Sequence, residues 1–178
     1  MTIKVLEKTE GCMPVIIDKG EFIDLRAAED ITLECPHAKM LHKHKTKEGV
    51  ERKREVILHS TLIPLGVCME IPKGYEAILV PRSSTFKKWG ILQTNSFGVI
   101  DNSFSSDEDE WKLPVVATKS ITIPKGERIC QFRVQLSQKA TIWQKIKWLF
   151  SGKIELKKVD HLNNEVRGGF GEGTKNIK

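Results

Sequence analysis

The sequence of 178 residues lacks any apolar run of about 20 residues, which is the length that a membrane-spanning helix needs. Its N-terminus, residues 1–17, lacks the long apolar core of a signal peptide. Only four cysteines are present, and no two of them form a Cys-x-x-Cys pair. Without a secretion signal we expect these cysteines to be reduced thiols. These absences predict a cytoplasmic protein with no membrane partner.

Length and charge set broad limits on what is present. A chain of 178 residues favours one domain, and it can bury about two-thirds of the surface that its unfolded chain exposes. The formal net charge is +6. Net charge governs steering and solubility, so it indicates an anionic partner only weakly.

Short segments rich in β-branched and apolar residues make up much of the chain. Turns that contain Pro and Gly separate them, and two of these turns, at 72–74 and 124–126, read Pro-Lys-Gly. No βαβ alternation is present, which argues against a parallel sheet. This pattern predicts an all-β sandwich or barrel. The expected strand segments are 31–36, 54–72, 75–81, 98–100, 113–118, 120–124 and 128–136.

Two segments interrupt this pattern. Residues 37–54 (HAKMLHKHKTKEGVERKR) are polar and basic, and we expect an extended loop or a hairpin tip there. Residues 140–151 carry large apolar side chains at helical spacing, which predicts an amphipathic helix that stops near Gly152. These apolar residues are Ile142, Trp143, Ile146, Leu149 and Phe150.

Two carboxylates stand at unusual places. Asp101 follows the apolar run Gly-Val-Ile and precedes Asn-Ser-Phe; Asp-Asn-Ser turn chemistry would explain it without any function. Asp24 interrupts the strand-like run Phe-Ile-x-Leu, where Asp is disfavoured. It is a candidate to hold a water of a hydrated magnesium ion, or else an edge or bulge residue. The acid run 107–111 is expected to be a solvated turn, with a glutamate as general base as the alternative.

Other polar groups suit phosphate. In PRSSTFKKWG (81–90), a guanidinium, hydroxyls and backbone N–H groups match phosphate oxygens, although a solvated basic turn is the alternative. Gln131 could donate to a phosphate oxygen or serve only its strand. The segment VRGGFGEGTK (166–175) resembles an anion-binding loop, or a flexible tail. Cys35 and the histidines near it match no zinc spacing.

Five of these segments occur in the order of the five motifs of the trimeric dUTPase family, which the chain resembles. The resemblance covers most of the chain outside 37–54 and 140–151. The motifs are EFIDLRA with Asp24, PRSS (81–84), NSFGVIDNSF (95–104), GERICQ (126–131) and RGGFGEGT (167–174).

The resemblance implies a jelly-roll-like or β-clip barrel, to which the apolar pattern of 140–151 adds one short amphipathic helix. It implies a β domain over 1–162 and a flexible glycine-rich arm over 163–178 that closes the active site. It also implies a homotrimer with active sites shared between subunits. An arm that orders only over bound nucleotide would be floppy without it.

The resemblance also implies roles for individual residues. Asp101 would activate the water that attacks the α-phosphorus of dUTP, giving dUMP and pyrophosphate. Phe104 would pack under the deoxyribose and exclude a 2′-hydroxyl. Mg²⁺, bound by Asp24 through water, would offset the charge of the triphosphate. The remaining substrate-binding residues would be Asn95, Gly98 and Ile100 at the uracil, Arg82, Ser83, Ser84, Gln131 and Arg167 at the phosphates, and Phe170 and Gly171 in the closing arm.

The chain departs from the family pattern at several positions. The family usually has Tyr where Phe104 stands, and we expect activity to survive because only the ring is needed. Ser106 replaces a usual Gly, which affects the local turn. Glu21 and Phe22 stand where Ala-Gly is usual. Motif five is one residue short, and Glu172 in place of Ser is expected to point away from the phosphates or to weaken arm binding.

Two other functions remain open. A dCTP deaminase has the same fold and would use Glu108 or Glu110; its product would be ammonia instead of pyrophosphate. A dUTPase-like regulatory protein would bind partners through its inserts. The basic segment 37–54 would then meet an acidic protein or nucleic acid, and the amphipathic segment 140–151 a membrane or a protein.

Overall fold

The protein is built almost entirely from strands. The computed structural model describes residues 1–17, 20–46, 49–150, 153–167 and 169, with the backbone alone for 40–46 and 50–54. Two helices are present among these residues, α1 (Thr85–Trp89) and α2 (Ile142–Leu149). The strands are β1 (Thr2–Glu7), β2 (Val15–Ile16), β3 (Ile23–Arg26), β4 (Ile31–Leu33), β5 (His37–Thr46), β6 (Gly49–Ile57), β7 (Ser60–Pro64), β8 (Val67–Glu70), β9 (Tyr75–Pro81), β10 (Ile91–Gln93), β11 (Gly98–Asp101), β12 (Lys112–Ala117), β13 (Ile121–Ile123), β14 (Arg128–Leu136) and β15 (Glu155–Val159).

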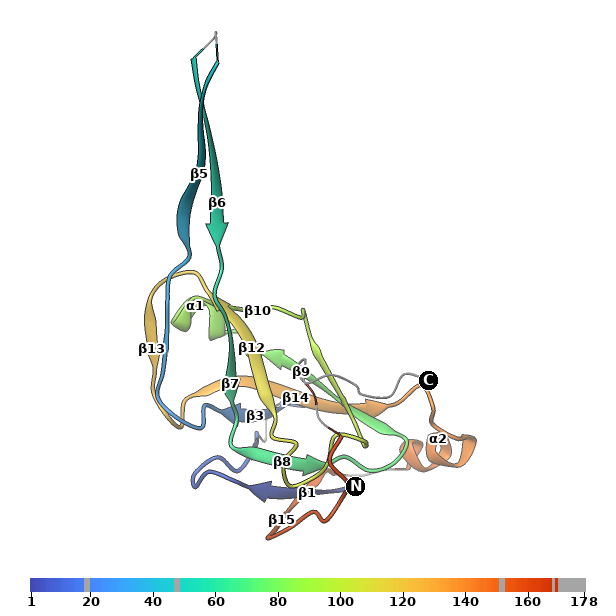
Figure 1. Cartoon of the computed structure of the whole chain (residues 1–178). Coiled ribbons are helices and arrows are strands. Elements are labelled where there is room, and N and C mark those ends of the chain that lie inside the picture. Colours follow the sequence, from blue (N-terminus) through green and yellow to red (C-terminus); the bar gives the residue numbers. More distant parts are fainter. Residues whose placement is uncertain (18–19, 47–48, 151–152, 168, 170–178) are drawn as a thin grey trace.

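The central sheet has five antiparallel strands in the order β11-β9-β14-β3-β2. Two three-stranded sheets, β10-β12-β7 and β15-β1-β8, pack beside it, and β13 pairs with β4 (Figure 1). The predicted all-β class is confirmed, and β14 begins and ends where its sequence pattern predicts. No sheet is wholly parallel, and one mixed sheet contains a parallel pair, β1 with β15, beside the antiparallel pair of β1 with β8. That pair joins the two ends of the domain, so no βαβ pattern could reveal it.

Alternating side chains of the strands form a single core between the sheets. Strand β9 alternates buried and half-buried residues from Tyr75 to Leu79, as period-2 geometry requires when one face is covered. At the centre, Trp111 and Phe132 are both fully buried, and their rings meet edge to face at 5.2 Å between centroids. This packing fixes β14, which carries the predicted site residue Gln131.

The two helices are short and differ in how well the sequence predicts them. Helix α1 lies in the segment 81–90, where we expected only a turn; Gly90 at its C-terminus adopts a left-handed conformation with φ 64°, which suits glycine. Helix α2 lies inside the predicted segment 140–151. A capping box between Thr141 and Gln144 starts α2.

Helix α2 meets the sheets with one side only. Trp148 packs on Tyr75 at 5.5 Å between ring centroids. The other large apolar residues of this segment point outward, and Trp143 is 76% exposed. None of the helices in the described residues is both long and apolar enough to cross a bilayer.

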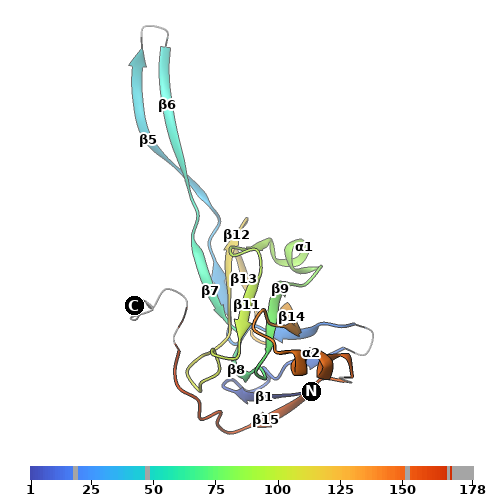
Figure 2. The same ribbon diagram turned by 90° about the vertical axis from the view of Figure 1, so that its right-hand side faces the viewer.

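The basic segment 37–54 is a β-hairpin and not an extended loop. Strands β5 and β6 pair antiparallel from His37↔Ile57 to Thr46↔Gly49, with a bulge between Met40 and His42. The hairpin forms a two-stranded sheet of its own. It projects away from the body of the protein in both views (Figures 1 and 2).

The two Pro-Lys-Gly turns provide a matched stability test. Gly74 and Gly126 have φ values of +86° and +82°, but only at Gly74 would an added Cβ meet another side chain, Gln144 at 2.3 Å. That amide also donates to the Lys73 carbonyl at 2.8 Å. We expect Gly126→Ala to cost about 1 kcal/mol through backbone strain, and Gly74→Ala to cost about 1–2 kcal/mol more because it displaces α2. Urea unfolding measures the difference; equal costs would contradict the α2 contact.

Candidate functional site

The first group of predicted site residues surrounds a buried carboxylate. Asp24 on β3 has no exposed surface. Its Oδ1 accepts a hydrogen bond from Arg82 Nε at 2.9 Å, and its Oδ2 accepts one from Arg128 NH1 at 3.1 Å. Strand pairing brings these residues together, because Arg82 follows β9 while β14 lies between β9 and β3. The odd Asp in a strand is therefore explained by two guanidinium groups that compensate its charge.

The predicted phosphate-binding residues other than Arg167 lie around this carboxylate. Ser83 and Ser84 are exposed and directly follow Arg82. Gln131 is the register partner of Asp24 on one side and of Val80 on the other. Thr85, which we did not single out, is buried and donates from Oγ1 to the Ile129 carbonyl at 2.7 Å. It also accepts from the Arg82 backbone N at 3.1 Å, so it fixes the turn that presents the serines.

Asp24 does not fit the predicted metal role in this arrangement. Each of its oxygens is held by an arginine, and its side chain has no contact with solvent. A hydrated Mg²⁺ needs oxygen ligands that its water shell can reach, and two guanidinium groups oppose a cation. Among the described residues no cluster of three or more His, Cys, Asp or Glu side chains could bind a metal ion.

The second group is centred on Asp101, at the end of β11. Ser103 donates to Asp101 Oδ1 from its backbone N at 3.0 Å and from its Oγ at 2.5 Å. Arg167 NH1 lies 3.1 Å from the same oxygen. The Asp101 side chain is 49% exposed. The strand end thus presents an oriented carboxylate at the surface.

The pKa of Asp101 reflects opposing effects. Burial raises this pKa, but the side-chain and backbone hydrogen bonds from Ser103 lower it, as do the charges of Arg167 and Lys139; the net pKa is below its usual value. Asp101 is therefore ionised at neutral pH. Ser103 is a site residue that our sequence reasoning missed, although its place two residues after Asp101 is the spacing of an Asx turn.

The remaining predicted residues of motif three flank Asp101. Asn95 is exposed in the turn before β11, and its Oδ1 accepts from Gln93 Nε2 at 2.8 Å. Gly98 and Ile100 are buried on β11. Phe104 is buried, and a Cβ added at Gly169 would lie 3.0 Å from its ring. The arm backbone therefore covers the ring in this structure. Phe170 and Gly171 lie outside the described residues, as does Glu172.

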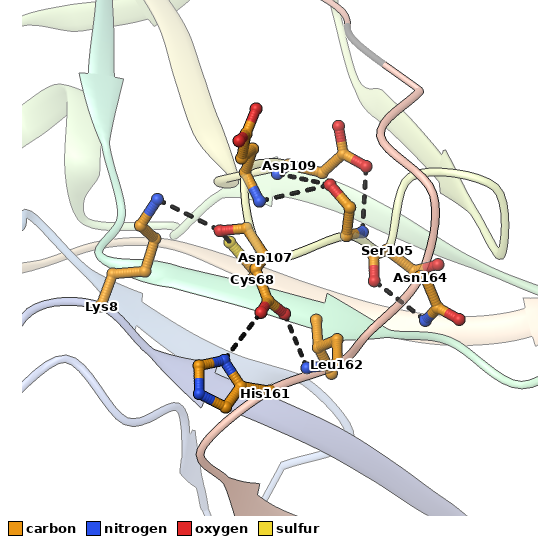
Figure 3. A network of polar contacts seen from close by, with 10 residues as sticks. Lys8, Cys68, Ser105, Asp107, Asp109, His161, Leu162 and Asn164 are labelled. Atoms are coloured by element: carbon orange, nitrogen blue, oxygen red, sulfur yellow. Dashed lines mark hydrogen bonds and ion pairs between the residues drawn. The ribbon is translucent and has the colours of Figure 1, made fainter.

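The acid run 107–111 is not a solvated turn, which corrects our expectation. Asp107 accepts from the Leu162 backbone N at 2.6 Å and lies 2.9 Å from His161 Nδ1 (Figure 3). Asp109 is buried and accepts from the Ser106 backbone N at 3.0 Å. Glu110 accepts from the Gly66 backbone N at 2.9 Å. These carboxylates anchor the start of the arm and the loop after motif three.

The loop after motif three accommodates Ser106, which stands where the family pattern usually has Gly. Its Oγ accepts from the backbone N of Glu108 and of Asp109, both at 3.2 Å. Ser106 is not among the residues with positive φ, so glycine is not required there.

Two further contacts hold the loop after motif three. Asn164 donates to the Ser105 carbonyl at 3.1 Å (Figure 3). Burial raises the pKa of the Cys68 thiol to about 12, so this thiol stays protonated and donates to the Asp107 carbonyl (Figure 3).

A cavity of about 420 Å³ adjoins Asp101. Its walls include two direct partners of Asp101, namely Ser103 and Arg167, together with Lys73 and Asn102. Asn102 is held in place because its Nδ2 donates to the Ile71 carbonyl at 2.6 Å. The Asp24 group does not line this cavity. Within one chain, the carboxylate of the second group and the arginines of the first group thus form two separate assemblies.

Comparisons with known proteins point in one direction. Residues 50–149 match the model of the dUTPase family. The SPbeta prophage-derived deoxyuridine 5′-triphosphate nucleotidohydrolase YosS of Bacillus subtilis (strain 168) is 40% identical over 174 residues, which cover 97% of each chain. The deoxyuridine 5′-triphosphate nucleotidohydrolase of Finegoldia magna is 32% identical, over 96% of this chain and 97% of its own.

Solved structures agree on the fold. The crystal structure of dUTPase from Streptococcus mutans superposes with a TM-score of 0.58 at 19% identity, covering 79% of this chain and 99% of that one. A dUTPase from phage phi11 of S. aureus, whose structure details the coordination of a structural Mg(II) ion, gives a TM-score of 0.57 at 16% identity, covering 80% and 95%.

Proposed function

Because the chain belongs to the dUTPase family, we propose that it hydrolyses dUTP to dUMP and pyrophosphate, with Asp101 activating the water that attacks the α-phosphorus. The observation that carries the proposal is the ionised, half-exposed Asp101 beside a cavity. Its action would remove dUTP from the DNA precursor pool and supply dUMP for dTMP synthesis. The cytoplasm, where such nucleotides are found, is the proposed location.

Asp101 has the geometry of a positioned general base. Among the described residues, its three hydrogen bonds all fall on Oδ1. This fixes the carboxylate and leaves Oδ2 to take a proton from water. The water oxygen then bonds to the α-phosphorus while the bond from the α-phosphorus to the bridging oxygen breaks, and pyrophosphate leaves. When dUTP binds, the Arg167 guanidinium would leave Asp101 and contact the γ-phosphate instead.

The other predicted residues would bind the base and the sugar of dUTP. Asn95 and the backbone of Gly98 and Ile100 would read the uracil edge, since all three belong to the turn and strand that lead to Asp101. The Phe104 ring would support the deoxyribose and leave no room for a 2′-hydroxyl. Phe170 and Gly171 of the arm would close over the base.

The Asp24 group would bind the phosphates. Arg82 is held rigid by Asp24, and Ser83 and Ser84 are exposed beside it; Gln131 completes the set. Charge-assisted hydrogen bonds from such groups suit phosphate oxygens. Mg²⁺ enters the proposal as the counter-ion carried by the triphosphate, because Asp24 is enclosed by its two arginines.

A homotrimer is proposed to bring the two groups together. One chain holds the Asp24 group and the Asp101 group apart, so a subunit neighbour would supply the missing half of each site. Leu92, Phe97 and Val99 near the Asp101 hairpin are each about half exposed, and subunit contact would cover such side chains. Sedimentation equilibrium should give three times the 20.2 kDa mass of one chain.

The test of the activity is a substrate panel. The protein with Mg²⁺ is incubated with dUTP, dCTP, dTTP and UTP, and both pyrophosphate and ammonia are measured. We expect pyrophosphate from dUTP alone, because the pocket reads uracil and excludes the 2′-hydroxyl. Ammonia from dCTP would instead assign the deaminase reaction. Binding of dUTP without cleavage would leave the regulatory protein as the better description.

Ser103 should tune the pH profile. Ser103→Ala removes a hydrogen bond that lowers the pKa of Asp101, so that pKa rises. A base works only when deprotonated, so the acid limb of kcat/KM should move to higher pH in this variant than in the unaltered protein. Ser105→Ala is the control, since its Oγ bonds the Asn102 carbonyl instead. An unmoved limb would mean that Asp101 is not the titrating base.

A further inference from the structure

The positive charge of the protein is concentrated in one element. Residues 37–54 contain seven Lys and Arg and two Glu, which gives +5, while the remainder of the chain has 22 Lys and Arg against 21 Asp and Glu, which gives +1. The complete hairpin of β5 and β6, residues 37–57, also contains Glu55 and so carries +4, which is two-thirds of the formal charge of +6. The proposed hydrolysis does not use this hairpin.

The hairpin places like charges opposite one another. Lys43 is the register partner of Arg52. Like charges directly opposite destabilise a strand pair, and an isolated two-stranded hairpin has marginal stability in water. The hairpin nevertheless projects from the body as a separate two-stranded sheet (Figures 1 and 2). A polyanion would relieve this repulsion.

We propose that the β5–β6 hairpin binds double-stranded DNA by entering its major groove. Successive strand residues alternate between the two faces, so the pair Lys43↔Arg52 lies on one face and the pair His42↔Lys53 on the other. Both faces are therefore basic. The major groove of B-DNA admits a two-stranded ribbon and has phosphates along both walls.

Other anionic partners match the hairpin less well. An acidic protein surface would meet only one of its two faces. A lipid surface requires an apolar face opposite the basic one, and the tip between His42 and Lys53 holds only Val50 as a large apolar residue. By contrast, the hairpin is long enough for the major groove of B-DNA. Its strand β5 has ten residues and extends about 30 Å, whereas the groove is about 12 Å wide.

The test uses the full chain and a fluorescein-labelled 20-base-pair DNA duplex of random sequence, followed by anisotropy over a salt series. The test variant combines Lys43→Gln, Arg52→Gln and Lys53→Gln. The matched control combines Lys139→Gln, Lys145→Gln and Lys147→Gln, which removes the same charge from exposed positions at α2. We expect the test variant to lose at least about tenfold in affinity and its salt slope to fall by about 2–3, because each lost phosphate contact lowers the slope by about 0.9. The control should change affinity less than about twofold.

A second variant guards against misfolding of the first. Replacing residues 43–52 with Asn-Gly joins the paired residues His42 and Lys53 by a two-residue turn, and it too should lose duplex binding. Both hairpin variants should still release pyrophosphate from dUTP at the rate of the unaltered protein. Absence of duplex binding at low salt, or equal losses in the test and control variants, would overturn the proposal. So would competition by polyglutamate as effective as that by unlabelled duplex, which would assign an acidic protein as the partner.

Discussion

Asp101→Asn should reduce kcat for dUTP hydrolysis by about 10²–10⁴-fold, while dUTP still binds. General-base catalysis contributes about 10²–10⁴-fold, and an amide cannot accept the proton of the attacking water. The shape of the side chain and the hydrogen bond from the Ser103 backbone are kept. The measurement is pyrophosphate release in single turnover together with dUTP binding by calorimetry.

The control for this variant is Asp160→Asn, which neutralises an exposed carboxylate outside both groups of site residues. It should leave kcat and KM unchanged. Asp101→Asn also removes the charge that faces Arg167. This variant should therefore bind dUTP at least as tightly as the unaltered protein. Substantial residual hydrolysis by Asp101→Asn would show that another group activates the water.

Asp24→Asn should lower the free energy of unfolding by about 3 kcal/mol. Asp24 is fully buried between Arg82 and Arg128, and removal of one partner of a buried ion pair leaves uncompensated charge. The released Arg82 should also bind phosphates less well, so KM for dUTP should rise. Urea unfolding measures the first effect and steady-state kinetics the second.

Glu127→Gln is the matched control for the loss of an ion pair. It breaks the contact of Glu127 with Lys88, whose side chains are 34% and 54% exposed, and such surface pairs contribute about 0–1 kcal/mol. Its unfolding midpoint should shift little. If Asp24→Asn is as stable as the unaltered protein but requires far more Mg²⁺ for activity, then Asp24 binds the metal and its arginine contacts are secondary.

Sequence reasoning located the strands well where one face is buried. The run Arg128–Leu136 and the run Tyr75–Pro81 alternate as half-buried strands do, and the structure has both. It missed β1 and β15, whose parallel pairing depends on chain ends that lie far apart in the sequence. It also missed α1, since a five-residue helix is too short to show helical periodicity.

The candidate site shows the same limit. The sequence identified Asp24, Arg82 and Asp101 separately, but an ion pair formed across three strands leaves no local pattern. The acid run was misjudged for the same reason: its partners Gly66, His161 and Leu162 are remote in sequence. Residue type predicted which groups carry chemistry, while their contacts required the fold.

The most direct measurement of the central claim is hydrolysis of dUTP in ¹⁸O-labelled water, with both products analysed by mass spectrometry. If water activated by Asp101 attacks the α-phosphorus, dUMP carries the label in its phosphate and the pyrophosphate carries none. Label in the pyrophosphate would mean attack at the β-phosphorus, and the placement of Asp101 at the α-phosphorus would then be contradicted.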